Sequence, residues 1–133
     1  MNGFKFDIKL LEVLLKCVMM GDLIQKVTLR NRAYEVHKGD TQKKYEKWME
    51  KCKDIMRKGT YKDFKRTVHE LVEDFETIEV DFSEEKPRVG IVGEVLIKYH
   101  PYGNNHIVEK LEEEGAEVVN PDFMGFLKFI CTH

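Results

Sequence analysis

The sequence predicts an α/β protein in which an N-terminal helical part, residues 1–82, precedes a partial α/β unit, residues 83–133. A pattern in each half carries this prediction. In the helical part the apolar residues recur at the spacing of one helix face. In the α/β unit a pair of short apolar runs, 89–92 and 116–119, encloses an amphipathic stretch that ends at Gly115. A strand, a crossover helix and a second strand in this order form a βαβ unit with two parallel strands.

Three helices are expected in the helical part. The first runs from Asp7, which can cap it, to about residue 30, and a bend or break is possible at Gly21. The second opens at Asp40, and residues 31–40 read as a connection. The third follows Thr60, which opens a capping box that has Asp in place of Glu. Residues 77–82 alternate between apolar and polar, which indicates a short edge strand or an extended linker.

The α/β unit has fewer strands than a parallel sheet normally contains. A single βαβ unit supplies two strands, whereas parallel sheets have more strands and are covered on both faces. Residues 123–130 have the spacing of an amphipathic helix, but the sequence stops soon after without a cap or a polar tail. We therefore expect one domain excised from a longer chain, with the remaining domains of that polypeptide as its partners.

Composition excludes several functions. With 133 residues, 42% hydrophobic residues and a net charge of −2, the chain has no basic field that indicates nucleic acid or an anionic membrane. No apolar run approaches the roughly 20 residues of a membrane span, and charges interrupt the N-terminal region where a signal peptide would lie. We expect a cytoplasmic protein. Its three cysteines, Cys17, Cys52 and Cys131, form neither a disulfide framework nor a C-x-x-C site.

The candidate site is the polar and aromatic loop after the first predicted strand. Open α/β sheets bind ligands beyond the carboxyl ends of their strands. The residues concerned are Glu94, Tyr99, His100, Asn104 and Asn105. Simpler roles remain open, because Glu94 can cap local backbone, either asparagine can be a helix N-cap, and the helix start can receive a phosphate or carboxylate. No metal is expected, because His100 and His106 have no third ligand at a recognisable spacing.

Two segments together resemble a known family, the 2-hydroxyacyl-CoA dehydratases, in particular the 2-hydroxyglutaryl-CoA dehydratase type and the branch linked to CoA-enzyme activase proteins. The likeness covers roughly residues 10 to 131, and residues 89–94 with the Asn104-Asn105 loop are its most specific portion. The first segment comprises residues 21–23, 32–35, 39–41 and Tyr45. The second comprises residues 89–94, 101–105, 111–118 and 121–122.

The resemblance implies a flavodoxin-like parallel sheet and an iron–sulfur enzyme. Such enzymes remove water from a 2-hydroxyacyl-CoA by a radical route, after an ATP-dependent activase has passed one electron to a [4Fe–4S] cluster. The resemblance identifies no cluster ligand among the three cysteines, so the chain alone is expected to be inactive and without a cofactor. It implies that Glu94, Tyr99, His100, Asn104 and Asn105 form a substrate-facing or cluster-facing edge.

Two other functions stay open at the level of sequence. One is a non-catalytic interaction module that docks to sister domains or to an activase, and that forms a dimer when isolated, because an unfinished sheet leaves an edge to be covered. The other is a free-standing flavodoxin-like binder of a small phosphorylated ligand.

Overall fold

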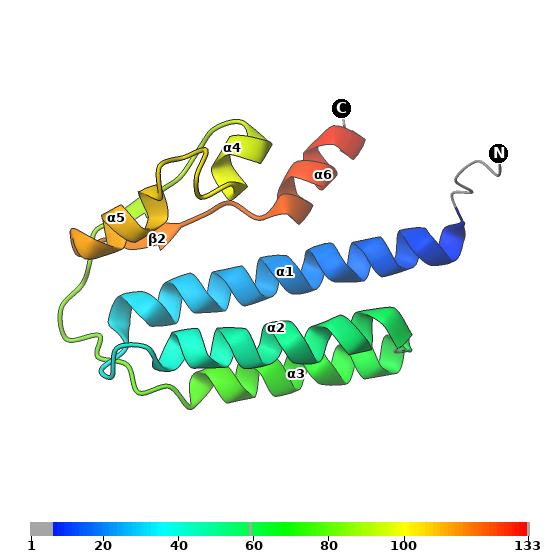
Figure 1. Ribbon diagram of the computed structural model, residues 1–133, viewed down its shortest axis with the longest axis horizontal. Helices are drawn as coiled ribbons and strands as arrows, with labels where there is room; N and C mark the ends of the chain where they lie inside the picture. Colours follow the sequence, from blue (N-terminus) through cyan, green and yellow to red (C-terminus); the bar gives the residue numbers. More distant parts are fainter. Residues whose placement is uncertain (1–6, 59, 133) are drawn as a thin grey trace.

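The computed structural model describes residues 7–58 and 60–132, and shows a mostly helical protein with a small two-stranded parallel sheet (Figure 1). The helical part contains α1 (Ile8–Tyr34), α2 (Asp40–Lys58) and α3 (Tyr61–Glu76). The α/β unit contains β1 (Arg88–Gly90), α4 (Val95–Tyr99), α5 (Ile107–Glu113), β2 (Glu117–Val119) and α6 (Phe123–Thr132). Gly59 and His133, which the sequence places at a helix end and at the last position, lie outside the described residues.

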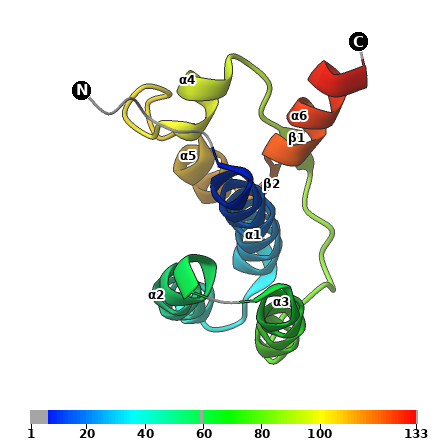
Figure 2. The same ribbon diagram turned by 90° about the vertical axis from the view of Figure 1, so that its right-hand side faces the viewer.

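Helix α1 is the central element of the molecule. Viewed along its axis, α1 has α2 and α3 on one side and the α/β unit, including α6, on the other (Figure 2). It is one continuous helix, so the break considered at Gly21 does not occur. It also runs further than expected, to Tyr34, because Ala33 and Tyr34 are buried against neighbouring elements. Asp7 occupies the N-cap position, but its side chain makes no capping hydrogen bond.

The hydrophobic core lies between α1, α2 and α3. Its buried members are Met20, Ile24, Trp48, Cys52, Met56, Phe64, Leu71, Phe75 and Ile78. The capping box predicted for α3 is confirmed, because the Asp63 amide donates to the Thr60 hydroxyl and the Thr60 amide donates to the Asp63 carboxylate. The cap starts the helix at the point where its apolar face can meet the other two.

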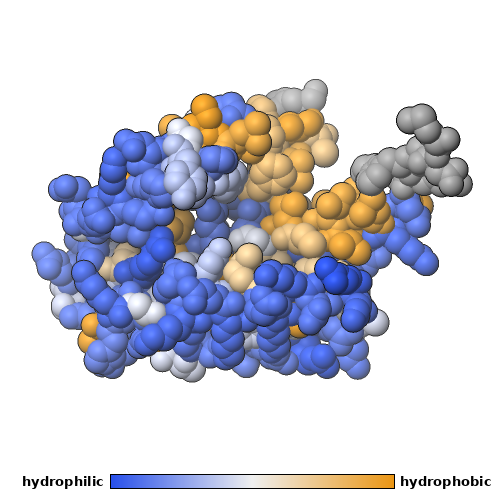
Figure 3. Space-filling view, in the orientation of Figure 1, coloured by the Kyte–Doolittle hydropathy of each residue, from blue (hydrophilic) through white to orange (hydrophobic). Residues whose placement is uncertain are grey.

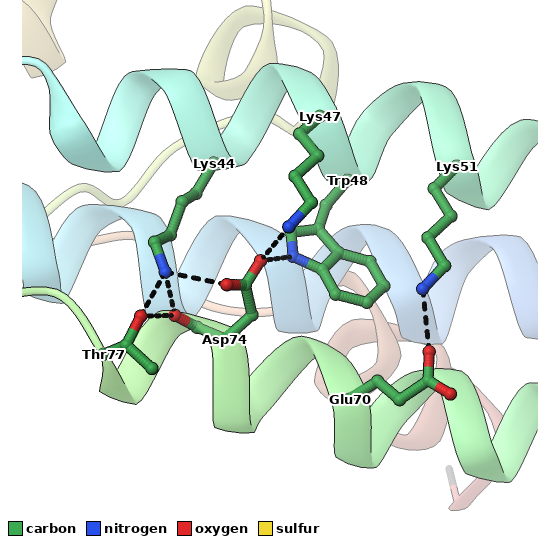
Figure 4. A network of polar contacts seen from close by, with 7 residues as sticks. All are labelled: Lys44, Lys47, Trp48, Lys51, Glu70, Asp74 and Thr77. Atoms are coloured by element: carbon green, nitrogen blue, oxygen red, sulfur yellow. Dashed lines mark hydrogen bonds and ion pairs between the residues drawn. The ribbon is translucent and has the colours of Figure 1, made fainter.

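A polar network on the outer side of this core joins α2 to α3 (Figure 4). The Asp74 carboxylate accepts hydrogen bonds from Lys44 Nζ at 2.8 Å, from Lys47 Nζ at 2.7 Å and from Trp48 Nε1 at 2.7 Å. The hydrogen bonds from the two lysines, with a further one from the Trp48 indole, hold the pKa of Asp74 well below its usual range. The buried indole therefore has a partner for its N–H group, as a tryptophan in a core normally requires.

Residues 77–82 form an extended linker with a single bridge rather than a strand. Val80 pairs antiparallel with Glu35, and the Val36 amide donates to the Glu79 carbonyl at 3.0 Å. Glu35 itself accepts hydrogen bonds from the amides of Gly39 and Thr41, and these bonds fasten the turn into α2. The linker is thereby tied to the end of α1 before the chain enters β1.

The βαβ order of the α/β unit is the predicted one. Val89 pairs with Val118 in a parallel register, and β1 ends at Gly90, two residues before the end of the predicted run. Gly115 ends the crossover as expected, with a φ of 87° that favours glycine after a helix. The loop expected to be irregular contains a short helix, α4, because the Glu94 side chain caps it. Among residues 7–58 and 60–132, none of the helices combines the length and apolarity needed to cross a membrane.

Candidate functional site

A cavity of about 550 Å³ lies between the helical part and the α/β unit. One wall consists of residues of α1 and α2, and the other of residues of α4, the following loop, α5 and the start of α6. Figure 3 shows this face of the molecule hollowed between the α/β unit above and α2 below. The cavity is lined by Asn120, which follows β2, and by Lys98, Tyr99, Pro101 and Asn104, which follow β1. It therefore lies beyond the carboxyl ends of both strands, where α/β sheets bind ligands.

Of the five predicted site residues, the structure brings Tyr99 and Asn104 to this cavity. Glu94, His100 and Asn105 are exposed and lie outside its lining. The predicted loop is therefore divided between a cavity wall and an outer surface. Helix α4 forms within a segment that was expected to be irregular, and its last residue, Tyr99, belongs to the cavity lining.

Glu94, His100 and Asn105 have local roles in the loop. The Glu94 carboxylate accepts a hydrogen bond from the Ile97 amide at 3.1 Å, which is the capping role left open by the sequence. His100 Nδ1 accepts a hydrogen bond from the Gly103 amide at 3.0 Å. Asn105 has a φ of 58°, in the left-handed region that asparagine tolerates better than most residues. These roles shape the loop and leave its inner side to other residues.

Tyr99 joins α4 to the start of α6. Its hydroxyl donates a hydrogen bond to the Pro121 carbonyl at 2.7 Å, and its ring meets Phe123 edge to face. Burial and then the nearby carboxylates of Asp22 and Asp122 raise the pKa of the Tyr99 hydroxyl, so it stays protonated and remains a donor at neutral pH. The ring of Tyr99 is thus held in place within the cavity wall.

Asn104 fastens the loop on its inner side. Its Nδ2 donates a hydrogen bond to the Lys98 carbonyl at 3.0 Å, and its Oδ1 accepts one from the Ile107 amide at 3.4 Å. The expectation that one of the two asparagines is the N-cap of the crossover helix is wrong, because His106 holds that position with a φ of 53°. The left-handed turn at residues 105 and 106 moves the N-cap position two residues beyond Asn104, which still supplies the capping oxygen.

Three polar contacts, which the sequence did not identify, help to hold the helical part and the α/β unit together. The Asp22 carboxylate accepts hydrogen bonds from the backbone amides of Phe123 at 2.9 Å and Met124 at 2.8 Å, and so caps α6 from the middle of α1. Arg32 Nε lies 2.9 Å from Glu112 Oε1.

The third contact, from Tyr34 to Glu117, is buried. The Tyr34 hydroxyl donates to Glu117 Oε2 at 3.0 Å. Asp22, Arg32 and Tyr34 all belong to the first segment on which the expected family resemblance rests, and this expectation was the one signal that could have singled them out.

The described residues do not fit a [4Fe–4S] cluster. No group of three or more His, Cys, Asp or Glu side chains in residues 7–58 and 60–132 is arranged to hold a metal ion. Cys17 on α1 and Cys131 on α6 are exposed, whereas Cys52 is buried in the core. Burial raises the pKa of the Cys52 thiol, which opposes the thiolate form that iron requires.

Comparison of the chain with protein-family models, with curated proteins and with solved structures finds no match in any of the three.

Proposed function

We propose that this chain is a domain of a 2-hydroxyacyl-CoA dehydratase or of an activase-related homologue, with β1 and β2 belonging to a larger flavodoxin-like sheet. The proposal is supported by contacts between the two segments on which the resemblance rests. Asp22, Arg32 and Tyr34 come from the first segment, and they contact residues within or directly after the second segment. Residues that recur together in a family for one structural purpose are expected to meet in this way.

In this proposal the chain does not carry out the reaction by itself. The iron–sulfur cluster supplies the one-electron chemistry, and its ligands come from the remaining domains of the polypeptide, because the described residues do not fit a cluster. The chain contributes the loop wall with Tyr99 and Asn104, at the sheet edge where such a fold presents its substrate. The partners are the remaining domains, an ATP-dependent activase and an acyl-CoA, in the cytoplasm.

The proposal is tested with the longer polypeptide that contains this chain. Under anaerobic conditions, with an activase, ATP and a reductant, it should convert a 2-hydroxyacyl-CoA to the 2-enoyl-CoA. The 133-residue chain alone should bind no iron after anaerobic reconstitution and should show no turnover. The proposal fails if the longer protein eliminates water without ATP or not at all, or if the isolated chain assembles a four-iron cluster.

A second candidate function is a non-catalytic docking module for the remaining domains of the same polypeptide. It is favoured by an apolar surface that extends over α4, α6 and the first half of α1 (Figure 3). Its exposed members are Ile8, Leu11, Leu14, Leu15, Met19, Leu96, Ile97, Phe126, Phe129 and Ile130. Contiguous apolar surface on this scale usually marks an interaction site.

Self-association of the isolated chain tests the docking function. With no sister domain present, the exposed apolar surface should make the chain dimerise in analytical ultracentrifugation, and Phe126→Glu with Ile130→Glu should return it to a monomer. Val36→Glu is the matched control, because Val36 is also exposed but lies in the turn after α1. A wild-type monomer at high concentration would count against docking.

The third function, binding of a small phosphorylated ligand at the start of α5, is not favoured. The first amide of that helix, from Ile107, already donates to Asn104 Oδ1.

A further inference from the structure

The cavity between the helical part and the α/β unit contains buried polar atoms that lack partners. The Thr28 side chain on α1 is 5% exposed, and its hydroxyl has no hydrogen-bond partner among the described residues. Asn120 follows β2, and its Oδ1 atom is buried and also has no hydrogen-bond partner among the described residues. Both residues line the cavity. Orphaned buried polar atoms are rare in native proteins and call for an explanation such as a ligand or an ordered water.

Thr28 and Thr41 are two buried helical threonines whose hydroxyls have no partner among the described residues, and of the two Thr28 lines the cavity. Thr67 on α3, which is equally well buried, donates its hydroxyl to the Asp63 carbonyl one turn before it, at 2.7 Å. Thr28 makes no such bond. Its buried hydroxyl therefore retains its full capacity to donate and to accept. The residue lines a cavity whose volume of about 550 Å³ falls within the usual range of ligand pockets.

The charged side chains around the cavity are already engaged by protein groups. Asp22 accepts two backbone amides, and Arg32 pairs with Glu112. Lys98 donates to the Pro121 carbonyl at 3.1 Å, and Glu109 lies 3.7 Å from His106. A neutral ligand leaves all of these contacts in place, and a carboxylate has no hydrogen to donate to Asn120 Oδ1. Much of the remaining wall is apolar, from residues such as Ile24, Leu29, Met49, Val108 and Phe123.

We infer that this cavity binds a small neutral molecule with an apolar body and one group that both donates and accepts hydrogen bonds, of which a primary carboxamide is the simplest. The carboxamide N–H would donate to Asn120 Oδ1, and its carbonyl would accept from the Thr28 hydroxyl. The apolar body would lie against α1 and α2. The inference does not depend on the proposed dehydratase role, because it concerns binding to this chain alone.

The test uses the 133-residue chain with hexanamide as the probe and hexanoate as a charged control of nearly the same shape. Titrations followed by ¹H–¹⁵N correlation spectra should show saturable shifts of the Thr28 and Asn120 signals with hexanamide and weaker binding of hexanoate. Thr28→Val should weaken hexanamide binding by about fivefold, the equivalent of one neutral hydrogen bond. Thr41→Val is the matched control, because Thr41 is fully buried but does not line the cavity.

Three results would overturn the inference: no saturable shift with hexanamide, equal affinity for hexanoate, or unchanged hexanamide affinity in Thr28→Val. The comparison of the two probes uses the wild-type chain, so it decides the question even if a variant does not fold. The outcome is also separate from that of the dehydratase assay, since the cavity can bind hexanamide in a protein without dehydratase activity, and the reverse also holds.

Discussion

The helical part and the α/β unit are held together by different forces. In the helical part, buried apolar side chains from α1, α2 and α3 form a continuous core. In the α/β unit, α4, α5 and α6 contain no buried residue, and burial is confined to β2 and the residue before it. This unit is instead fixed to α1 by Asp22, Arg32 and Tyr34. The helical part can thus be stable by itself, whereas the α/β unit depends on α1.

Helix α1 serves both sides of the molecule, which explains why its apolar residues are not confined to one face. Ile24 packs in the three-helix core, and residues on other sides of the helix, such as Asp22 and Arg32, face the α/β unit. A helix between two layers is expected to be apolar around more of its circumference than a surface helix. Over its first half several of its apolar side chains are exposed, and the apolar surface of α4 and α6 continues there.

The largest expected effect is the loss of a core side chain in the helical part. Phe75 is 1% exposed, so Phe75→Ala should lower the free energy of unfolding by about 3–5 kcal/mol, because it removes a large buried ring and leaves a cavity. Leu96→Ala in α4, where the side chain is 77% exposed, should change it by less than about 0.5 kcal/mol. Urea denaturation measures both. Similar losses in the two variants would contradict the division into a packed helical part and a dependent α/β unit.

The next effect concerns the attachment of α6 to α1. Asp22→Ala removes the acceptor of two backbone amides, and should cost about 2 kcal/mol in the free energy of unfolding. Hydrogen exchange at the amides of Phe123 and Met124 should accelerate more than exchange in α2 or α3. Asp122→Ala is the control, because Asp122 accepts only the Gly125 amide within α6 itself. If both variants behaved alike, Asp22 would not be the tie between α1 and α6.

A third effect is the acid sensitivity of the helical part. The pKa of Asp74 is lowered in the folded state, chiefly by the hydrogen bonds from Lys44 and Lys47, so its ionised form stabilises the native state above the unfolded pKa of about 3.9. This contribution is lost as the pH falls below about 4 toward the lower folded pKa. Asp74→Asn should therefore cost about 1.5 kcal/mol at pH 7, and less as the pH falls through that range.

Denaturation at a series of pH values measures this effect. Glu70→Gln is the control, because Glu70 pairs with Lys51 at the surface, where such pairs contribute little. The difference in the free energy of unfolding between Asp74→Asn and the wild type could instead be constant from pH 7 to pH 2. In that case the charge of the Asp74 carboxylate would not contribute to the acid sensitivity.

The elements that could be predicted from the sequence are those with a local signal. The capping box at Thr60, the glycine stop at Gly115 and the order of the βαβ unit each depend on a few neighbouring residues, and each is confirmed. Helix α4 was not predicted because its residues 95–97 are apolar without a helical period, and a side chain before them, Glu94, decides the conformation.

The candidate site was predicted only on its loop side, since Tyr99 and Asn104 line the cavity. Its other wall could not be predicted, because Asp22 and Thr28 lie far away in the sequence on α1 and acquire their roles only when the α/β unit packs against that helix. Neither residue type signals a site by itself. A carboxylate in mid-helix usually faces solvent, and a threonine there usually bonds to its own helix.

The smallest expected effect separates the two asparagines of the loop, and tests how the dependent α/β unit holds its own shape. Asn104→Ala removes two hydrogen bonds, to the Lys98 carbonyl and from the Ile107 amide, and should cost about 1 kcal/mol in the free energy of unfolding. Asn105→Gly should be neutral within about 0.5 kcal/mol, because glycine adopts the left-handed φ of 58° without strain. Thermal unfolding of both variants at one pH gives the comparison. Equal losses would mean that the left-handed turn, rather than the Asn104 side chain, sets the start of α5 and positions this wall of the cavity.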